Sequence, residues 1–196
     1  EDSANKILAN GGIINQGLSV QHRGINYSYL CYQGDYYLPC YNLYPMIFEK
    51  IENDIVLDTR REIQNCFNKL KEDFESRGFM VNGDATNYSI ELLPGRIKVN
   101  LNKRMQISKG ESSQSFNDFG AEILSPVYNL AGIAREIVNG ESQFCNFEYN
   151  GFMLLYPKYK ISRIDYDNSK IYKVTDRLTG REFRFAVRSC AYPPGI

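Results

Sequence analysis

The sequence predicts an α+β domain in which a long amphipathic helix packs on antiparallel sheets, a second, shorter helix follows, and disulfides staple the chain. Three observations support this fold class. Apolar residues recur at helical spacing after Pro45, they alternate with polar residues in several later segments, and the chain contains five cysteines. Since the order is long helix, strand meander, second helix and second meander, α+β fits better than a regular alternation of strands and helices.

The length and the charge of the chain limit the number of domains and the kinds of partner that we expect. The 196 residues are enough for one domain with a substantial core, and no repeat or linker divides them, so we expect a single domain over residues 1–196 with its core in residues 43–196. Lysine plus arginine equals aspartate plus glutamate at 23 each. The chain therefore has no excess positive charge with which to bind phosphates, so we expect no nucleic-acid partner. The sequence also has no run of 18 apolar residues to cross a bilayer.

The first 42 residues combine the end of a helix with an irregular segment. Residues 1–10 predict a short helix, which Gly11-Gly12 would end in the left-handed conformation common after helices. Because the chain opens inside this helix, we expect the helix to continue upstream. Residues 11–42 are rich in tyrosine, glycine and turn signals, so we expect them to be the least regular part of the chain.

A long helix is expected between Pro45, which suits a first helical turn, and Gly78, which suits a stop. One apolar stripe runs along it and charged residues, including Asp54, mark a solvated face. The stripe consists of Ile47, Ile51, Ile55, Ile63, Phe67, Leu70 and Phe74. At roughly 30 residues, this helix would be the main scaffold of the domain, since helices in globular proteins average about 11–12.

After Gly78 the period changes to two, which predicts strands. Residues 87–93 and 97–101 predict a hairpin around Pro94-Gly95, whose second strand continues through Met105 and Ile107 to Gly110. Residues 116–124 predict a third strand.

A second helix and a second meander complete the chain. The helix is expected from Ser125-Pro126 to Asn139-Gly140, and residues 143–156 fit either a short helix or a strand. The last three predicted strands, turned at Asp167-Asn168 and Thr179-Gly180, are residues 158–164, 170–175 and 182–187.

The cysteines carry the strongest chemical signal. Cys31 and Cys40 enclose the loop CYQGDYYLPC, which a disulfide would hold at a gain of roughly 2.5–3 kcal/mol. Cys190 could reach Cys145, which leaves Cys66 unpaired or paired outside the chain. The alternative is five buried free thiols in a cytosolic protein. No Cys-x-x-Cys or His–Cys ligand spacing occurs, so we expect no zinc site.

The tyrosines around this loop are candidate binding residues. The chain has 15 tyrosines, and their amphipathic rings suit either a half-exposed β surface or a recognition face. For the recognition face, the candidate residues are Tyr32, Asp35, Tyr36, Tyr37 and Tyr41. Two Asn-x-Ser sequons make Asn26 and Asn87 weak candidates for glycosylation in an extracytoplasmic protein.

Catalytic patterns are missing from the sequence. His22 is the one histidine, and no GxSxG, GxxxxGK[ST], GxGxxG or HExxH motif occurs. Residues 165–168 lack the spacing of a calcium loop and predict a turn. We therefore expect no enzyme, cofactor or metal. A carboxylate-based enzyme is the last-ranked hypothesis, because a pair drawn from Glu148, Asp165, Asp167 and Asp176 need only meet in space.

Several segments carry a resemblance to a known group of proteins. They are Glu1-Asp2, Gly11-Gly12, the segment YSYLCYQGDYYLPC, the helix bearing Cys66, the strand end at residues 107–110 and Phe183-x-Phe185. In this order they resemble uncharacterised archaeal surface proteins, which have a pilin-like signal and an N-terminal membrane helix that leads into an extracytoplasmic α+β domain. The resemblance implies a membrane anchor in a segment missing from this chain, and an upstream cysteine as partner for Cys66.

Two functional hypotheses follow from the sequence. The first is a non-enzymatic surface or assembly protein, the ectodomain of a membrane-anchored, pilin-like subunit at the cell surface with a protein partner. The alternative is a glycan- or protein-binding module that uses the disulfide-held, tyrosine-rich loop, because rigid aromatic side chains lose little entropy on binding.

Overall fold

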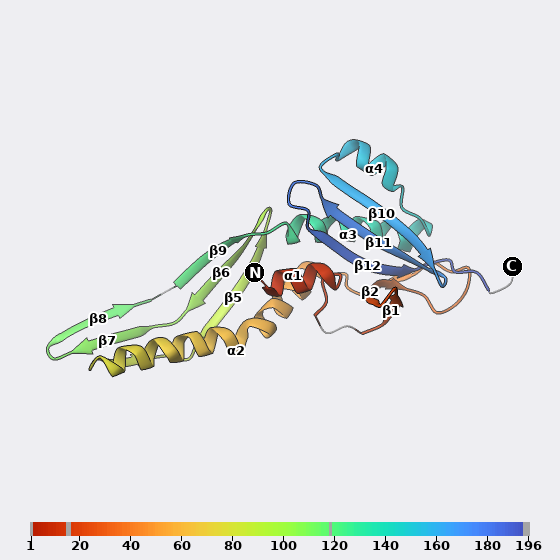
Figure 1. The fold of residues 1–196 in the computed structure, drawn as a ribbon. Helices are drawn as coiled ribbons and strands as arrows, with labels where there is room; N and C mark the ends of the chain where they lie inside the picture. Colours follow the sequence, from red (N-terminus) through yellow and green to blue (C-terminus); the bar gives the residue numbers. More distant parts are fainter. Residues whose placement is uncertain (1, 15–16, 118, 194–196) are drawn as a thin grey trace.

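The computed structural model describes residues 2–14, 17–117 and 119–193 and confirms the α+β class. A body and an arm make up the molecule (Figure 1): most helices and one sheet form the body, while the long helix and a narrow ribbon of strands project from it. The helices of the described residues are α1 (Asp2–Ala9), α2 (Ile47–Ser76), α3 (Val127–Phe144) and α4 (Tyr149–Leu155). None of these helices is both long and apolar enough to cross a membrane.

The body is built on a six-stranded sheet in the order β1-β2-β12-β11-β10, with β3 paired to β2. All neighbours are antiparallel except β2 and β12, which run parallel and join the two ends of the chain. The strands are β1 (Ser19–His22), β2 (Ile25–Tyr32), β3 (Tyr41–Asn42), β10 (Tyr159–Tyr166), β11 (Ser169–Asp176) and β12 (Glu182–Arg188). The last three confirm the predicted C-terminal meander.

The expectation of an irregular segment over residues 11–42 is wrong, because this segment contains β1, β2 and β3. Arg23 and Gly24 adopt positive φ angles of 50° and 78°, which makes the tight β1–β2 hairpin turn. Five consecutive residues of β2 are buried, since the strand lies inside the sheet with both faces covered. A strand buried on both faces lacks the alternation by which strands are recognised in sequences.

Helix α1 confirms the predicted N-terminal helix, apart from Glu1, which lies outside the described residues. Its apolar side is buried, and Gly11 and Gly12 follow with φ angles of 66° and 88°. A Cβ atom on Gly11 would lie 2.6 Å from the carbonyl oxygen of Arg184 and 2.9 Å from the Cβ of Phe185. Glycine is therefore required here twice, for its positive φ and for the close approach of α1 to β12.

Helix α2 begins at Ile47, two residues after the predicted start, because Pro45 lies in the preceding turn. Only its first part enters the main core, where Ile47, Ile51 and Ile55 are buried; the rest of the predicted stripe is half-buried. Placing Asp54 on a solvated face was wrong. Its side chain is 4 % exposed, pairs with Lys50 and accepts a hydrogen bond from the backbone N–H of Ile14 at 3.0 Å. A backbone donor from another segment thus draws this carboxylate inside.

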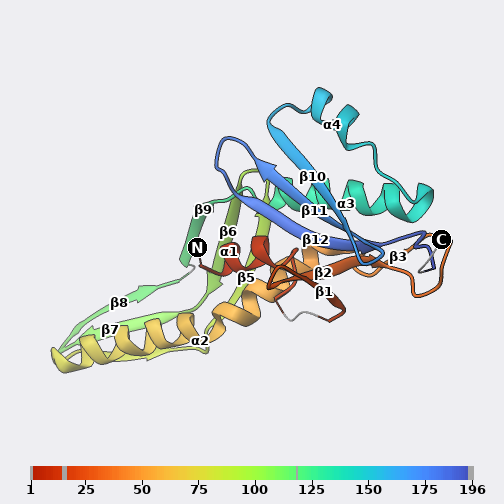
Figure 2. The same cartoon turned by 45° about the vertical axis from the view of Figure 1, so that its right-hand side comes forward.

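The arm contains two three-stranded sheets along α2. Figure 2 shows them end to end, so that β4 leads into β5, β6 into β7, and β8 lies ahead of β9. The sheet nearer the body has β5 (Asn87–Leu93), β6 (Arg96–Asn102) and β9 (Phe119–Leu124); the distal sheet has β4 (Met80–Gly83), β7 (Met105–Lys109) and β8 (Ser112–Phe116). The predicted hairpin is confirmed as β5 and β6, which pair over their whole length.

The predicted continuation of the second strand to Gly110 is wrong, because the ribbon breaks after β6 and β7 belongs to the distal sheet. At the break, Lys103 Nζ donates to the carbonyl oxygen of Asp84 at 2.6 Å and to Thr86 Oγ1 at 3.1 Å. A Cβ atom on Gly83 would lie 2.9 Å from the carbonyl oxygen of Arg104, so a larger residue would not fit. The predicted third strand is likewise divided, with Phe116 ending β8 and Phe119 starting β9.

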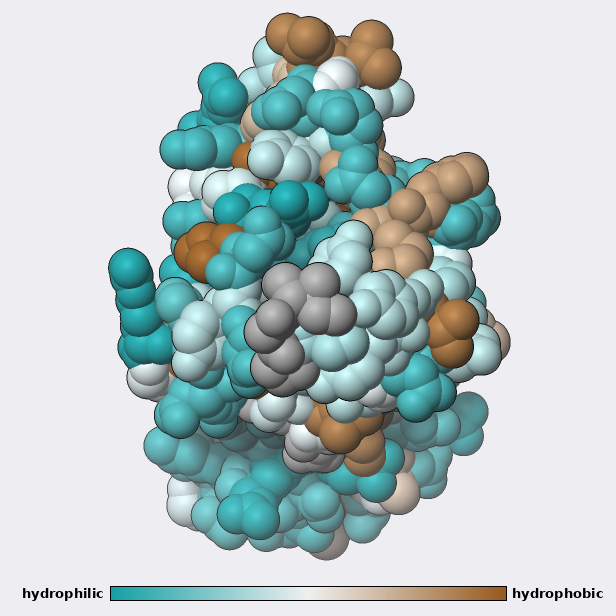
Figure 3. Space-filling view, turned by 90° about the vertical axis from the view of Figure 1, so that its right-hand side faces the viewer, coloured by the Kyte–Doolittle hydropathy of each residue, from teal (hydrophilic) through white to brown (hydrophobic). Residues whose placement is uncertain are grey.

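Helix α3 supplies the centre of the main core. All six residues of its predicted apolar side are buried: Val127, Leu130, Ala131, Ala134, Ile137 and Val138. The helix runs to Phe144, past the predicted end at Asn139-Gly140. The ambiguous segment that follows forms a helix, α4, because the Glu148 side chain accepts hydrogen bonds from the backbone N–H groups of Asn150 and Gly151. Figure 3 shows apolar atoms at the top of the body over α4, where Leu154 and Leu155 are exposed.

Candidate functional site

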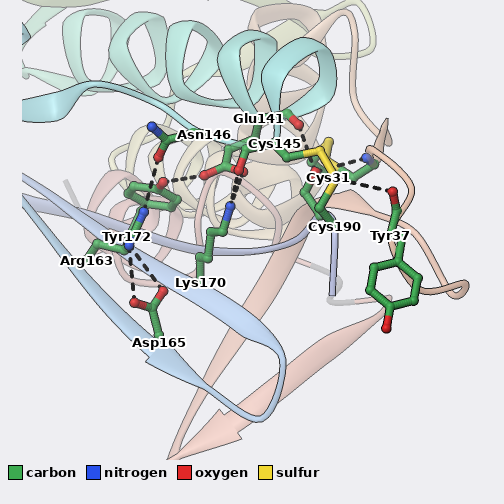
Figure 4. A network of polar contacts seen from close by, with 12 residues as sticks. Cys31, Tyr37, Glu141, Cys145, Asn146, Arg163, Asp165, Lys170, Tyr172 and Cys190 are labelled. Carbon is green, nitrogen blue, oxygen red and sulfur yellow. Dashed lines mark hydrogen bonds and ion pairs between the residues drawn. A yellow bond between two sulfur atoms is a disulfide. The ribbon is translucent and has the colours of Figure 1, made fainter. Parts of the chain in front are cut away.

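A buried polar cluster lies between α3 and the body sheet, close to the ends of β11 and β12 (Figure 4). Its centre is Glu141, which is fully buried on the last turns of α3. One carboxylate oxygen accepts a hydrogen bond from the hydroxyl of Tyr172, and the other pairs with Lys170 Nζ at 2.6 Å. Lys170 also donates to the carbonyl oxygen of Cys145. The buried carboxylate of Glu141 is therefore paired with a cation and hydrogen-bonded by its direct neighbours.

The cluster also joins both disulfides. Cys31–Cys40 and Cys145–Cys190 are formed, as the sequence predicts. Ser189 Oγ donates to the carbonyl oxygen of Glu141 at 2.8 Å and accepts from the backbone N–H of Cys40 at 3.1 Å. Ser189 precedes Cys190, so one hydroxyl connects α3, the tyrosine-rich loop and the C-terminal segment.

The electrostatics of this cluster favour a fixed structural arrangement. Burial raises the pKa of the Tyr172 hydroxyl above its usual value, and the neighbouring Glu141 carboxylate raises it further. Tyr172 consequently stays protonated at physiological pH and remains a hydrogen-bond donor to Glu141. Through these contacts the cluster holds the last turns of α3 against β11.

A pocket of about 440 Å³ lies beside the cluster, between the β10–β11 turn and the C-terminal segment. Arg163 stands in its wall, where it pairs with Asp165 at 3.2 Å and donates to Asn146 Oδ1 at 3.3 Å (Figure 4). The pocket mixes cations, carboxylates and aromatic rings; its lining residues are Arg163, Asp165, Tyr166, Asp167, Asn168, Ser169, Lys170, Ser189, Cys190, Ala191 and Tyr192. Such a wall can hold a polar ligand with an apolar face.

The structure brings together some of the predicted binding residues. The guanidinium of Arg188 lies 5.7 Å from the ring centre of Tyr32 and 5.4 Å from that of Tyr36, so these two tyrosines hold one cation. The Tyr37 ring packs edge-on against Tyr192, 5.6 Å between centres, and Tyr192 lines the pocket.

Tyr41 on β3 is paired with Tyr32 on β2, and Asp35 lies in the loop between these two strands. The backbone N–H of Asp35 bonds to Gln33 Oε1 in a local turn, and the Tyr41 side chain on β3 is 71 % exposed. Tyr192 was not predicted as a binding residue, because no local pattern marks a residue whose place depends on contact with Tyr37. Glu141 was missed for a simpler reason, since the predicted end of its helix came before it.

Of the four candidate carboxylates, Asp165 and Asp167 line the pocket together, while Glu148 and Asp176 lie elsewhere. Glu148 caps α4, while Asp176 accepts from the backbone N–H groups of Leu178 and Thr179 and pairs with Lys158 at 3.3 Å. Across the described part of the chain, no three of the histidine, cysteine, aspartate and glutamate side chains gather where they could hold a metal ion. The ring of His22 packs edge-on against Tyr166, 4.5 Å between ring centres.

Three predicted modification sites lie on the surface. The Cys66 thiol is free and exposed on the part of α2 that belongs to the arm. Asn26 on β2 and Asn87 on β5 are both exposed, which is the accessibility that a glycosylated asparagine requires.

Together, the fold and the site define a disulfide-stapled α+β domain with a projecting arm. Two disulfides are typical of proteins that fold in an oxidising compartment outside the cytoplasm. Comparison with models of known protein families, with curated proteins and with solved structures gives no match for this chain.

Proposed function

We propose that this protein is a non-enzymatic surface or assembly protein that acts outside the cytoplasm through contacts with other proteins. The observation that supports this most is the arm. It extends well beyond the body in Figures 1 and 2, and it places a long helix and a ribbon of strands where another chain can reach them.

The energetics of the arm favour a role in binding. The distal sheet and the end of α2 share a small buried cluster of Val81, Met105 and Ile107. Ordering each residue costs roughly 1–2 kcal/mol in backbone entropy, which a small cluster offsets poorly. Apolar side chains such as Met80, 66 % exposed, and Leu57, 59 % exposed, also remain in contact with water. Burial of this surface in an assembly would add hydrophobic stabilisation, which offsets the entropy cost of ordering the arm.

The membrane anchor and the pilin-like character implied by the sequence resemblance belong to the same proposal. The two disulfides support the extracytoplasmic part of it, because cytosolic thiols are kept reduced. The polar cluster supports the non-enzymatic part, since its ionisable groups are engaged in holding α3 to the sheet.

The proposed location outside the cytoplasm can be tested by alkylating the protein in lysates of its own cells, without reduction, and measuring its intact mass. We expect Cys31, Cys40, Cys145 and Cys190 to escape alkylation before reduction and to take up four alkyl groups afterwards. Fractionation of the same cells should place the protein with the envelope and not with the cytosol. Alkylation of all five thiols before reduction would contradict an extracytoplasmic address.

A second candidate function is a glycan-binding module, favoured by the contact of Tyr37 with Tyr192 beside the pocket. We expect the purified protein to bind members of a glycan array, and a Tyr37→Ala plus Tyr192→Ala variant to lose at least tenfold in affinity, since each aromatic contact is worth about 1 kcal/mol. Tyr41→Ala is the control, because Tyr41 is exposed but is not among the residues that line the pocket. Equal binding by all three forms would exclude this pocket as the glycan site.

A further inference from the structure

Strand β8 is an unprotected edge of the arm. Among the described residues it pairs with β7 alone and ends the order β4-β7-β8. Figures 1 and 2 both show it along the side of the arm away from α2. Its sequence, SSQSF, contains no charge and no proline, and all five residues are exposed. Natural proteins usually protect such edges with lysine, proline or a bulge, because free backbone groups invite another strand.

An apolar groove runs beside this edge. It has a volume of about 470 Å³ and lies between the end of α2 and β8. Leu70 and Phe74 of α2 pack on the buried cluster that β4 and β7 supply, whereas Phe116 on β8 remains 36 % exposed. The lining residues are Phe74, Phe79, Ile107, Lys109, Ser112, Ser113, Gln114 and Phe116.

The register of the sheet shows which β8 side chains face the groove. Gln114 pairs with Ile107 and Phe116 with Met105, and both of these partners are buried toward α2. Directly paired residues point to the same face, so the side chains of Ser112, Gln114 and Phe116 face the groove. Ser113 borders the groove, but its Oγ accepts a hydrogen bond from Gln106 Nε2 at 2.8 Å on the opposite face, which the Ser115 side chain shares.

We propose that β8 pairs antiparallel with β8 of a second copy of this chain, about a two-fold axis at Gln114. This register places Ser112 opposite the second copy's Phe116, and therefore brings that phenylalanine to the groove lined by Phe74 and Phe79. By symmetry, each copy fills the groove of the other. The pairing needs no charge compensation, because β8 carries none.

A second copy fits this edge better than an unrelated partner. One two-fold axis pairs the two β8 strands and also brings Phe116 of each copy to the groove of the other. The inference deepens the proposed assembly function by naming the partner and rests on it. Self-association and cellular address are measured separately, so that either can fail without the other.

The test is sedimentation of the purified wild-type protein and of two charge variants. We expect wild type to form a concentration-dependent dimer. Ser113→Lys plus Ser115→Lys puts two like-charged pairs across the axis, since residue 113 lies opposite residue 115 of the second copy. We expect association at least about tenfold weaker, and the same for Ser113→Glu plus Ser115→Glu.

Mixing the two variants gives the decisive result. Each lysine then faces a glutamate, and we expect the mixture to form a heterodimer at wild-type affinity, which also shows that both variants are folded. Leu124→Ser on β9 is the control, since Leu124 is 92 % exposed on the same ribbon but outside the pairing. A wild-type protein that stays monomeric, or variants that dimerise unmixed, would overturn the inference, while the oxidised cysteines and envelope location would still support the proposed function.

Discussion

Replacing Glu141 with leucine is expected to lower the free energy of unfolding by about 3–5 kcal/mol, the usual effect of breaking a buried ion pair. Leucine fills the space but leaves the Lys170 ammonium, 18 % exposed, and the buried Tyr172 hydroxyl without their carboxylate partner. Urea unfolding of the oxidised protein measures the change. A triple replacement, Glu141→Leu with Lys170→Met and Tyr172→Phe, should recover most of the loss, because no charge then remains unpaired.

A matched control exists on the outer part of the same sheet. Glu182 pairs with Lys173 at 3.0 Å and with Arg184 at 2.5 Å, but all three side chains are partly exposed. Burial raises the pKa of Glu182, yet the hydrogen bonds from Arg184 and Lys173 outweigh it and the net pKa is lowered. Solvent screens these pairs, so Glu182→Leu should cost less than about 1 kcal/mol. If Glu141→Leu costs no more than this, the cluster does not stabilise the body as argued.

Removal of the Cys145–Cys190 disulfide by replacing both cysteines with alanine is expected to lower the free energy of unfolding by about 4 kcal/mol. The disulfide joins residues 45 apart in sequence, and the loss of unfolded-state entropy from so long a loop is large. The same replacement of Cys31–Cys40, whose residues are only 9 apart, should cost about 2.6 kcal/mol. Urea unfolding of the two variants under identical conditions gives the comparison.

Cys66→Ala is the control for both disulfide variants. Its thiol is free and exposed, so the change should stay within about 0.5 kcal/mol. The order of the two disulfides is the informative result. If loss of Cys31–Cys40 destabilises more, that disulfide acts through the native contacts of Cys40 with Ser189, and not mainly through the unfolded chain.

Local pattern was sufficient for the elements that bury one face. The apolar side of α3 and the β5–β6 hairpin follow from spacing alone, because a helix or half-buried strand records its orientation in every third, fourth or second residue. The disulfide pairs were also predictable. Cys31 and Cys40 enclose a short loop, and Cys190 follows the last strand, from which it could reach Cys145.

Pattern failed where burial depends on a distant segment. Strand β2 lies inside the sheet because β12, from the other end of the chain, pairs with it, so its sequence shows no alternation. Asp54 is buried because the backbone of Ile14 donates to it. The candidate binding site shows the same limit: the loop tyrosines were found, but the pocket beside them was not.

Residue types at short or fixed spacing were enough to predict the class of fold, the helix α1, the β5–β6 hairpin, the C-terminal meander and both disulfide pairs. Three features became visible only in the folded chain: half of α2 leaves the body as part of the arm, β8 lies at an edge of its sheet, and Glu141 lies between Lys170 and Tyr172. These features arise from contacts between segments far apart in the chain. The free energy of such contacts depends on which surfaces remain exposed to water after all the segments have packed.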